Sequence, residues 1–261
     1  MTLEPPVKPL RQRLIDLGLL LAVVVALAFS APAVHLGDMG MLFSHSSNMQ
    51  HFLAGMRHPD FDHWRDYAQD MFLTLQMALW GSFLAVLLAV PLGLLAARNV
   101  APVYIQQPVR RLLDALRSVP DLVVGTLFVL AVGLGPLAGV LAIALNTGGV
   151  LGKLFSEAVE SIDPAPVEGV RAVGAHPLAE VVYGVAPQVA PLWTSFALYR
   201  FESNARSATI LGLIGAGGIG QRLFESLEGF EYGQTAMIIL VIVASVSMID
   251  LLSQAIRTRL T

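Results

Sequence analysis

The sequence predicts an all-α integral membrane protein with six transmembrane helices. Hydrophobic residues make up 55% of the 261 residues, charged residues make up 13%, and the mean hydropathy is +0.68. An ordinary soluble domain, by contrast, is about 25% charged. Six apolar segments are close to the roughly 17–25 residues that a helix needs to cross a bilayer. The distribution of basic residues then predicts which side of the membrane each connection faces.

The six apolar segments follow one another with polar connections between them. They are residues 14–31, 74–97, 119–135, 137–155, 181–203 and 235–256. The first follows basic residues, as in a signal peptide, but Pro32 makes residues 30–33 a poor cleavage site, so we expect an uncleaved helix. The third and fourth segments are separated only by residues 133–136, which predicts a tight helical hairpin.

The basic residues divide unevenly between the two sides of this arrangement. With the N-terminus inside, the cytoplasmic side holds Lys8, Arg11, Arg13, Arg98, Arg110, Arg111, Arg117, Lys153, Arg171, Arg257 and Arg259. The outer side, including the outer end of the fifth helix, holds Arg57, Arg65, Arg200, Arg206 and Arg222. Because cytoplasmic connections are rich in Lys and Arg, both termini are predicted to be cytoplasmic.

Two parts are expected. Residues 1–70 form an N-terminal transmembrane helix and a large outer loop, and residues 71–261 form the main membrane domain with a polar cytoplasmic loop at 160–187. The outer loop, residues 32–70, contains His35, His45, His51, His58 and His63 together with five aspartates. His and Asp are metal ligands, but their spacing matches no compact motif. We expect a solvated acidic loop and no metal site.

Composition excludes several functions. A net charge of −3 does not favour a nucleic-acid partner, which needs a basic face. The absence of cysteine excludes disulfides, thiolate nucleophiles and zinc–thiolate sites. No Walker sequence for binding nucleotide phosphates occurs. We predict no catalytic residue in this chain.

The polar stretch 163–187 has the start and stop signals of a helix, a sharp turn and a second helix. Asp163 is a candidate N-cap, followed by Pro164 in the first turn. Gly174 provides a left-handed stop. His176 and Pro177 then open the next helix.

Polar residues also occur within the apolar segments. The short amphipathic stretch 106–118 either lies at the cytoplasmic interface or extends the third helix inward. Asn146 and Thr147 lie within the fourth helix, and Arg200, Asn204 and Ser207 lie near the outer end of the fifth. Buried polar groups in lipid either bond helices together or line a water-filled path, and both interpretations remain open.

A glycine-rich stretch follows the fifth helix. Gly215, Gly217, Gly218 and Gly220 include the spacing G-x-G-x-x-G of dinucleotide-binding loops. That spacing binds a dinucleotide only between a strand and a helix, and here a membrane helix precedes it. We therefore predict an outer loop used for close packing or as a gate.

Several of these stretches together resemble the permeases of phosphonate ABC importers. The 163–187 loop is similar to the coupling loop of ABC importer permeases, the Glu-Ala-Ala motif. Glu168, Gly174 and Pro187 match its spacing, and Gly169, Val170, Gly184 and Ala186 depart from its residues. The stretches beginning at Leu116, Gly149 and Leu198 resemble the phosphonate family more specifically. The similarity covers residues 74–261.

The resemblance implies a type I ABC importer (MetI-like) fold and an alternating-access mechanism. It implies a permease homodimer in the bacterial inner membrane, a cytoplasmic ABC ATPase dimer and a periplasmic substrate-binding protein. ATP and Mg²⁺ are expected on the ATPase, and no cofactor in this chain. The expected substrates are phosphonates, phosphite or hypophosphite.

Roles follow for particular residues, from the resemblance for the loop and from the polar side chains at depth for the path. Residues expected to couple to the ATPase are Glu168, Gly169, Arg171, Ala172, Gly174, His176 and Pro187. Residues expected to line the path are Asn146, Thr147, Arg200, Asn204 and Ser207.

Three alternative functions remain. The first is a related importer for methionine, a sulfonate or another oxyanion. The second is an integral membrane enzyme, for which no intramembrane Ser/His or Asp/Asp pair is apparent, and the third is a passive scaffold, which leaves the loop spacing unexplained.

Overall fold

The computed structural model describes residues 10–44 and 46–258. All regular secondary structure in these ranges is helical, as the sequence predicts. The chain separates into two compact units, Met1–Ala54 and Gly55–Thr261. Each unit is described by itself.

The N-terminal unit contains helices where the sequence predicts an outer loop. It contains α1 (Leu10–Ser30), η1 (Leu36–Gly40), α2 (Met41–Ser44) and most of α3 (Ser46–Met56). Helix α1 contains the first predicted span and is long and apolar enough to cross a membrane. The expected loop 32–70 is helical over much of its described length, and no helix-breaking proline occurs between Pro32 and Pro59.

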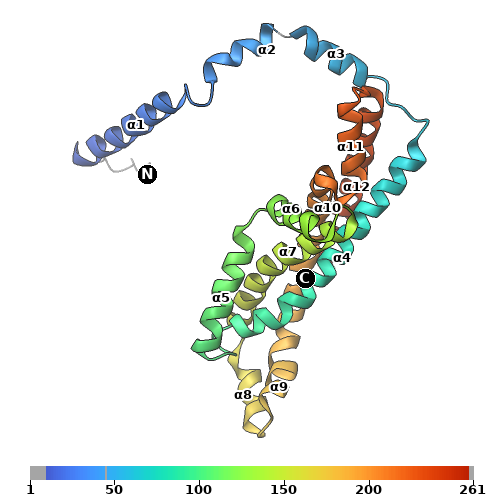
Figure 1. The fold of residues 1–261 in the computed structure, drawn as a ribbon. Helices are drawn as coiled ribbons and strands as arrows, with labels where there is room; N and C mark the ends of the chain where they lie inside the picture. Colours follow the sequence, from blue (N-terminus) through green and yellow to red (C-terminus); the bar gives the residue numbers. More distant parts are fainter. Residues whose placement is uncertain (1–9, 45, 259–261) are drawn as a thin grey trace, which may run out of the picture. The chain divides into compact units, whose positions relative to one another are not determined.

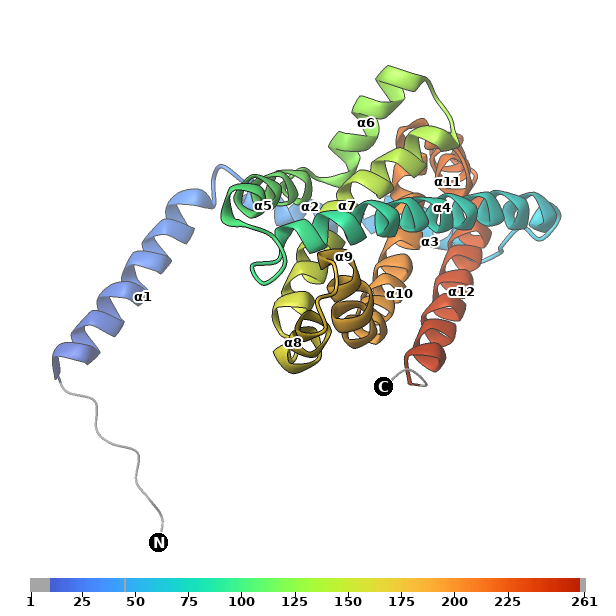
Figure 2. The ribbon, with the colours of Figure 1, turned by 90° about the horizontal axis from the view of Figure 1, so that it is seen from below.

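The second unit is a bundle of long helices with short helices at its two ends (Figures 1 and 2). Its elements are α4 (Trp64–Ala96), α5 (Val103–Ser118), α6 (Asp121–Val132), α7 (Pro136–Glu160), α8 (Pro164–Ala172), α9 (Pro177–Ala179), η2 (Glu180–Val185), α10 (Ala186–Leu211), η3 (Gly212–Ala216), α11 (Ile219–Glu228) and α12 (Tyr232–Arg257).

Helices α4 and α7 form the closest pair in this bundle and run in the same direction. Gly81 of α4 faces Ile143 of α7, and just over three turns further along both helices Gly93 faces Phe155. A Cβ at either glycine would lie under 3.0 Å from the facing side chain. Small residues are typical where membrane helices approach closely, because packing rather than hydrophobicity drives their association.

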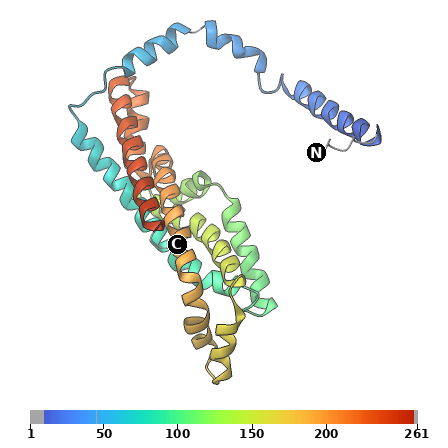
Figure 3. The same ribbon diagram turned by 180° about the vertical axis from the view of Figure 1, so that it is seen from behind.

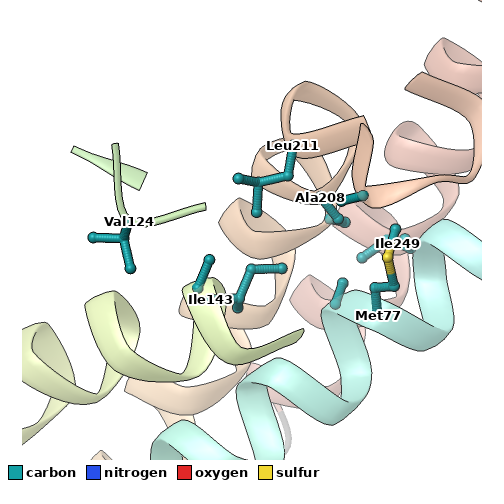
Figure 4. Packing of buried hydrophobic residues seen from close by; sticks show 10 residues of the cluster. Met77, Val124, Ile143, Ala208, Leu211 and Ile249 are labelled. Atoms are coloured by element: carbon teal, nitrogen blue, oxygen red, sulfur yellow. The ribbon is translucent and has the colours of Figure 1, made fainter. Parts of the chain in front are cut away.

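The core of the bundle lies where α4, α6, α7, α10 and α12 converge (Figure 4). Its labelled members are Met77, Val124, Ile143, Ala208, Leu211 and Ile249. Leu211, near the end of α10, shares this cluster with Met77, whereas Trp193, nearer the start of α10, packs in a cluster with Ala89, further along α4. Helix α10 therefore runs antiparallel to α4.

The third predicted span, residues 119–135, is wrong as a single straight helix. Helix α6 has 12 residues and is about 18 Å long at 1.5 Å per residue, whereas the hydrocarbon core is about 30 Å thick. It is bent by 90° from α5. Pro120 causes the break, since the residue before a proline is driven out of the helical region, and Val119 has φ −88° and ψ 125°.

Helix α5 rules out one interpretation of residues 106–118, the inward extension of the third helix, while the interfacial location stays a prediction. It begins earlier, at Val103, and it is not a straight extension of α6. Its Leu113 is buried, because it packs against Gly152 of α7. In the described residues, five helices are long and apolar enough to span a membrane, or six if the bent pair α5–α6 counts as one span.

Candidate functional site

The predicted helix–turn–helix at residues 163–187 is present, and its caps are those that the sequence indicates. Asp163 accepts a hydrogen bond from the backbone N–H of Ala165 at 3.0 Å, which caps α8. Gly174 has φ +76°, the left-handed conformation that favours glycine. His176 accepts from the N–H of Leu178 at 3.2 Å and caps the next helix.

An ion pair joins the two arms of this loop. Arg171 of α8 donates from Nη2 to Glu180 at 2.8 Å and from Nε to both carboxylate oxygens at 3.2 Å. These hydrogen bonds raise the pKa of Arg171. The ion pair is exposed, so it orients the arms more than it stabilises the fold.

Close backbone approach and one amide fix the base of the loop. A Cβ at Gly184 would lie 2.9 Å from Cα of Val167, so glycine lets α8 press against η2. Gln188 donates from Nε2 to the carbonyls of Asp163 and Gly184, at 3.1 and 2.7 Å. It also accepts from the N–H of Asp163 at 3.1 Å. Sequence reasoning missed Glu180 and Gln188, because partners 9 and 25 residues away leave no local pattern.

The turn itself presents its side chains to the outside. All the predicted coupling residues are exposed: Glu168, Gly169, Arg171, Ala172, Gly174, His176 and Pro187. Beside them, Val173 is 83% exposed and Leu178 is 68% exposed. Pro187 lies at the start of α10 rather than at the turn. A hollow of about 450 Å³ lies beneath the loop, between α8, η2 and residues 99–100.

A second polar cluster lies deep in the bundle and joins α4, α7 and α10. Thr147 donates to the side-chain oxygen of Asn204 at 2.8 Å, and Asn204 donates to Ser82 at 2.8 Å. Arg200 is half-buried and reaches the Thr147 hydroxyl at 3.4 Å from Nη2. Its buried Nε has no hydrogen-bond partner among the described residues. The cluster therefore combines satisfied interhelical bonds with one guanidinium that retains a free donor.

The two remaining predicted path residues bond to the corner between α5 and α6 instead. Asn146 donates from Nδ2 to the carbonyl of Val119 at 2.8 Å. Ser207 donates to the carboxylate of Asp121 at 2.8 Å. Asp121 and Ser207 also line a hollow of about 190 Å³. Sequence reasoning missed Ser82 and Asp121, although a Ser inside an apolar span and an Asp directly after Pro120 were visible signals.

The predicted position of Arg200 and Arg206 at the outer end of the fifth helix is wrong. Glu202 pairs with Arg206 at 3.6 Å and with Arg257, near the end of α12, at 3.2 Å. Arg206 also reaches Asp250 at 3.5 Å. Figure 3 shows the last turns of α12 beside the middle of α10 and far from α8 and α9. The fifth helix starts earlier and continues further than predicted, from Pro177 to Ala216.

The glycine-rich stretch is a tightly packed turn between α10 and α11. Gly215, Gly217 and Gly218 all have positive φ, from +73° to +96°. A Cβ at Gly220 would overlap the carbonyl oxygen of Thr209, and the N–H of Ile219 donates to Thr74 of α4 at 2.9 Å. A helix precedes this turn, so it lacks the strand that a dinucleotide-binding loop requires.

Arg222 ties the segment after this turn to α4. It donates from Nε to Asp70 at 3.0 Å, and this hydrogen bond raises the pKa of Arg222. Of the histidines in the predicted outer loop, His35 and His63 pair with single aspartates, at 3.2 and 3.4 Å. His45 lies outside the described residues. Within the described ranges, no three His, Asp or Glu side chains are grouped as a metal site requires.

Comparisons with known proteins agree with this geometry. Residues 89–261 match the family described as "binding-protein-dependent transport system inner membrane component". The chain is 45% identical over 200 residues to the phosphite transport system permease protein PtxC of Stutzerimonas stutzeri, covering 76% of this chain and 73% of that protein. It is 56% identical over 117 residues to the putative cryptic phosphonate transport system permease protein PhnE2 of Escherichia coli K12, covering 45% and 96%.

The fold has a solved counterpart. A chain from an inward-facing structure of the MetNI methionine ABC transporter superposes with a TM-score of 0.69 at 20% identity, covering 77% of this chain and 99% of that chain. The likeness shows that the two chains share a fold. The chain therefore belongs to the family of binding-protein-dependent transport system inner membrane components, as a multi-pass membrane protein with a MetI-like fold.

Proposed function

We propose that the chain is the membrane-spanning subunit of an ATP-driven importer that carries phosphite, a phosphonate or a related small phosphorus oxyanion such as hypophosphite. The observation that carries this proposal is the 45% identity to a phosphite permease over 200 residues. The exposed helix–turn–helix at 163–187 is the surface that such a subunit presents to an ATPase.

The proposal includes the partners and the orientation. Two copies of the chain form a homodimer in the bacterial inner membrane, with both termini in the cytoplasm. A cytoplasmic ABC ATPase dimer binds the α8 turn and supplies ATP and Mg²⁺, and this chain carries no cofactor. A periplasmic binding protein delivers the anion from the other side. The basic residues of the sequence support this orientation, because most of them lie in the connections predicted to be inside.

Within this proposal the two clusters have separate roles. The α8 turn transmits closure of the ATPase dimer, and its ion pair between Arg171 and Glu180 keeps both arms in register. Arg200 contributes to the path a half-buried guanidinium whose buried Nε has no partner among the described residues, and an anion crossing hydrocarbon needs such hydrogen-bond donors. Thr147 and Asn204 hold this region of the three helices together.

Uptake of labelled phosphite tests the proposal. The chain is expressed together with an ABC ATPase and a periplasmic binding protein of a phosphite importer, in a host that lacks phosphite uptake. We expect uptake that requires all three proteins and that an excess of unlabelled phosphonate reduces. Uptake of methionine or a sulfonate, without phosphite or phosphonate, would assign the chain to another importer of the same fold.

A further inference from the structure

Arg110 of α5 is bonded at once to the ends of two other helices. Its side chain is 13% exposed. Its Nε donates to the carbonyl of Ala96, the last residue of α4, at 2.8 Å. Its Nη2 donates to Glu160, the last residue of α7. One guanidinium therefore fixes α5 to both α4 and α7 at the same end of the bundle.

The same end of α7 leads directly into the coupling loop. Glu160 also accepts from the backbone N–H of Arg98 at 2.8 Å, and Asn99 donates to the carbonyl of Val159 at 2.7 Å. Only residues 161–163 separate Glu160 from α8. A displacement of α8 therefore acts on Glu160 and, through it, on Arg110.

The far end of α5 leads to the polar residues at depth. Helix α5 has 16 residues and is about 24 Å long at 1.5 Å per residue. It ends at the corner where Val119 accepts from Asn146 and Asp121 accepts from Ser207. These two hydrogen bonds connect the corner to α7 and α10.

Between its two ends, α5 lies on a smooth part of α7. A Cβ at Gly149 would lie 2.7 Å from Cβ of Leu116, and a Cβ at Gly152 would lie 2.6 Å from a methyl group of Leu113. Two glycines thus face two leucines, with no α7 side chain interlocked at these points. The two glycines let the leucines of α5 approach the α7 backbone closely, so α5 packs tightly against α7 between its two ends.

We propose that Arg110 is a positioning residue that transmits movement of the coupling loop to α5, and that α5 acts as a lever on Asp121 and Ser207. The inference rests on the proposed importer function. A guanidinium suits the role, because its planar fork bonds a carbonyl and a carboxylate in fixed directions, which lysine cannot do. Arg110 is held by Ala96 of α4 and by Glu160 of α7, so it transmits movement of the loop in either direction.

The first test compares ATP hydrolysis with transport in the complete complex, reconstituted in liposomes with its ATPase and binding protein. The variants are Arg110→Ala, Arg110→Lys and Glu160→Gln. The matched control is Arg111→Ala, which removes the same charge from the adjacent exposed position. We expect Arg110→Ala and Glu160→Gln to keep ATP hydrolysis but lower phosphite uptake per ATP by about fivefold or more, as for loss of a typical coupling between two sites. Arg110→Lys should recover part of the loss, and Arg111→Ala should match wild type.

The second test measures movement directly. Spin labels on cysteines introduced at exposed Leu79 of α4 and Leu127 of α6 report their separation with and without ATP. We expect the separation to change with ATP in wild type and not in Arg110→Ala. An unchanged response in Arg110→Ala, or equal losses of hydrolysis and uptake with a lowered melting temperature, would make Arg110 a structural tether and overturn the proposal. Absence of phosphite uptake in both wild type and Arg111→Ala would contradict the proposed substrate, while the label distances would still decide on the lever.

Discussion

Two glycines of the loop at 163–187 allow the effect of backbone strain to be measured apart from the effect of an added side chain. Gly174 has φ +76°, whereas Gly169 lies inside α8, and a Cβ at either position meets nothing within 4 Å. We expect Gly174→Val to strain the turn by about 1–3 kcal/mol and to abolish uptake without preventing membrane insertion. Gly169→Ala should leave uptake unchanged, since alanine is favoured over glycine in a helix by roughly 0.5–1 kcal/mol. Uptake and purified yield of both variants check this, and normal uptake by Gly174→Val would contradict it.

The buried amide of Asn204 tests the polar cluster at the same scale. It donates to Ser82 and accepts from Thr147, so Asn204→Ala removes two interhelical hydrogen bonds. We expect a loss of stability of about 1 kcal/mol, because one such bond within a membrane contributes about 0.6 kcal/mol on average and about 1.7 kcal/mol at most. The control is Thr194→Ala, whose exposed hydroxyl bonds only within α10, to Ala190. Melting curves in detergent compare the two, and equal melting temperatures for Asn204→Ala and wild type would show that the bonds contribute nothing.

At the scale of elements, the glycine-rich turn sets the contact between α10 and α11. Gly220 has no room for a Cβ, because the carbonyl of Thr209 occupies that space. Gly217 has φ +86°, but a Cβ there would lie 3.8 Å from its nearest neighbour, Pro136. Steric overlap with a backbone atom in α10 is relieved only by moving a helix, whereas strain at Gly217 stays within the turn.

This difference predicts which of two glycine substitutions lowers stability and uptake more. Gly220→Ala should lower the melting temperature and uptake together, because α11 is displaced from α10. Gly217→Ala should cost about 1–3 kcal/mol of local strain and reduce uptake less. Neither variant should change binding of NAD or FAD, which we expect to be absent. Equal melting temperatures for the two variants would contradict the packing role of Gly220, and saturable NAD binding would contradict the whole interpretation.

At the scale of the whole molecule, the opposite ends of the second unit should face opposite sides of the membrane. Val173 lies at the α8 turn, and Glu228 ends α11 at the other end of the bundle (Figure 1). Both are exposed, and the chain contains no cysteine. In intact cells, a membrane-impermeant thiol reagent should label Glu228→Cys, and it should label Val173→Cys only after the cells are opened. Labelling of Val173→Cys in intact cells would reverse the proposed orientation.

Local chemistry explains which predictions are confirmed. The helical fold and five of the spans follow from runs of apolar residues, which report where the chain has a helix apolar enough to cross a membrane. The caps at Asp163, Gly174 and His176 follow from neighbours one to three residues away. These features depend on short stretches of chain, so the sequence alone determines them.

Only the tertiary structure decides how the helices are aligned with one another. The position of Arg200 and Arg206 depends on the stagger of α10 against α12, and the ion pair between Glu202 and Arg257 joins residues 55 positions apart. Pro120 was visible in the sequence as a signal for a helix break, but the 90° angle of the bend depends on the packing of α5 and α6 against α7. Packing likewise brings four residues to hydrogen-bond partners that are distant in sequence: Ser82, Asp121, Glu160 and Gln188. Hydropathy along one chain reports which segments are apolar enough to span a membrane but not their register against their neighbours, because register is set by side-chain packing between segments distant in sequence.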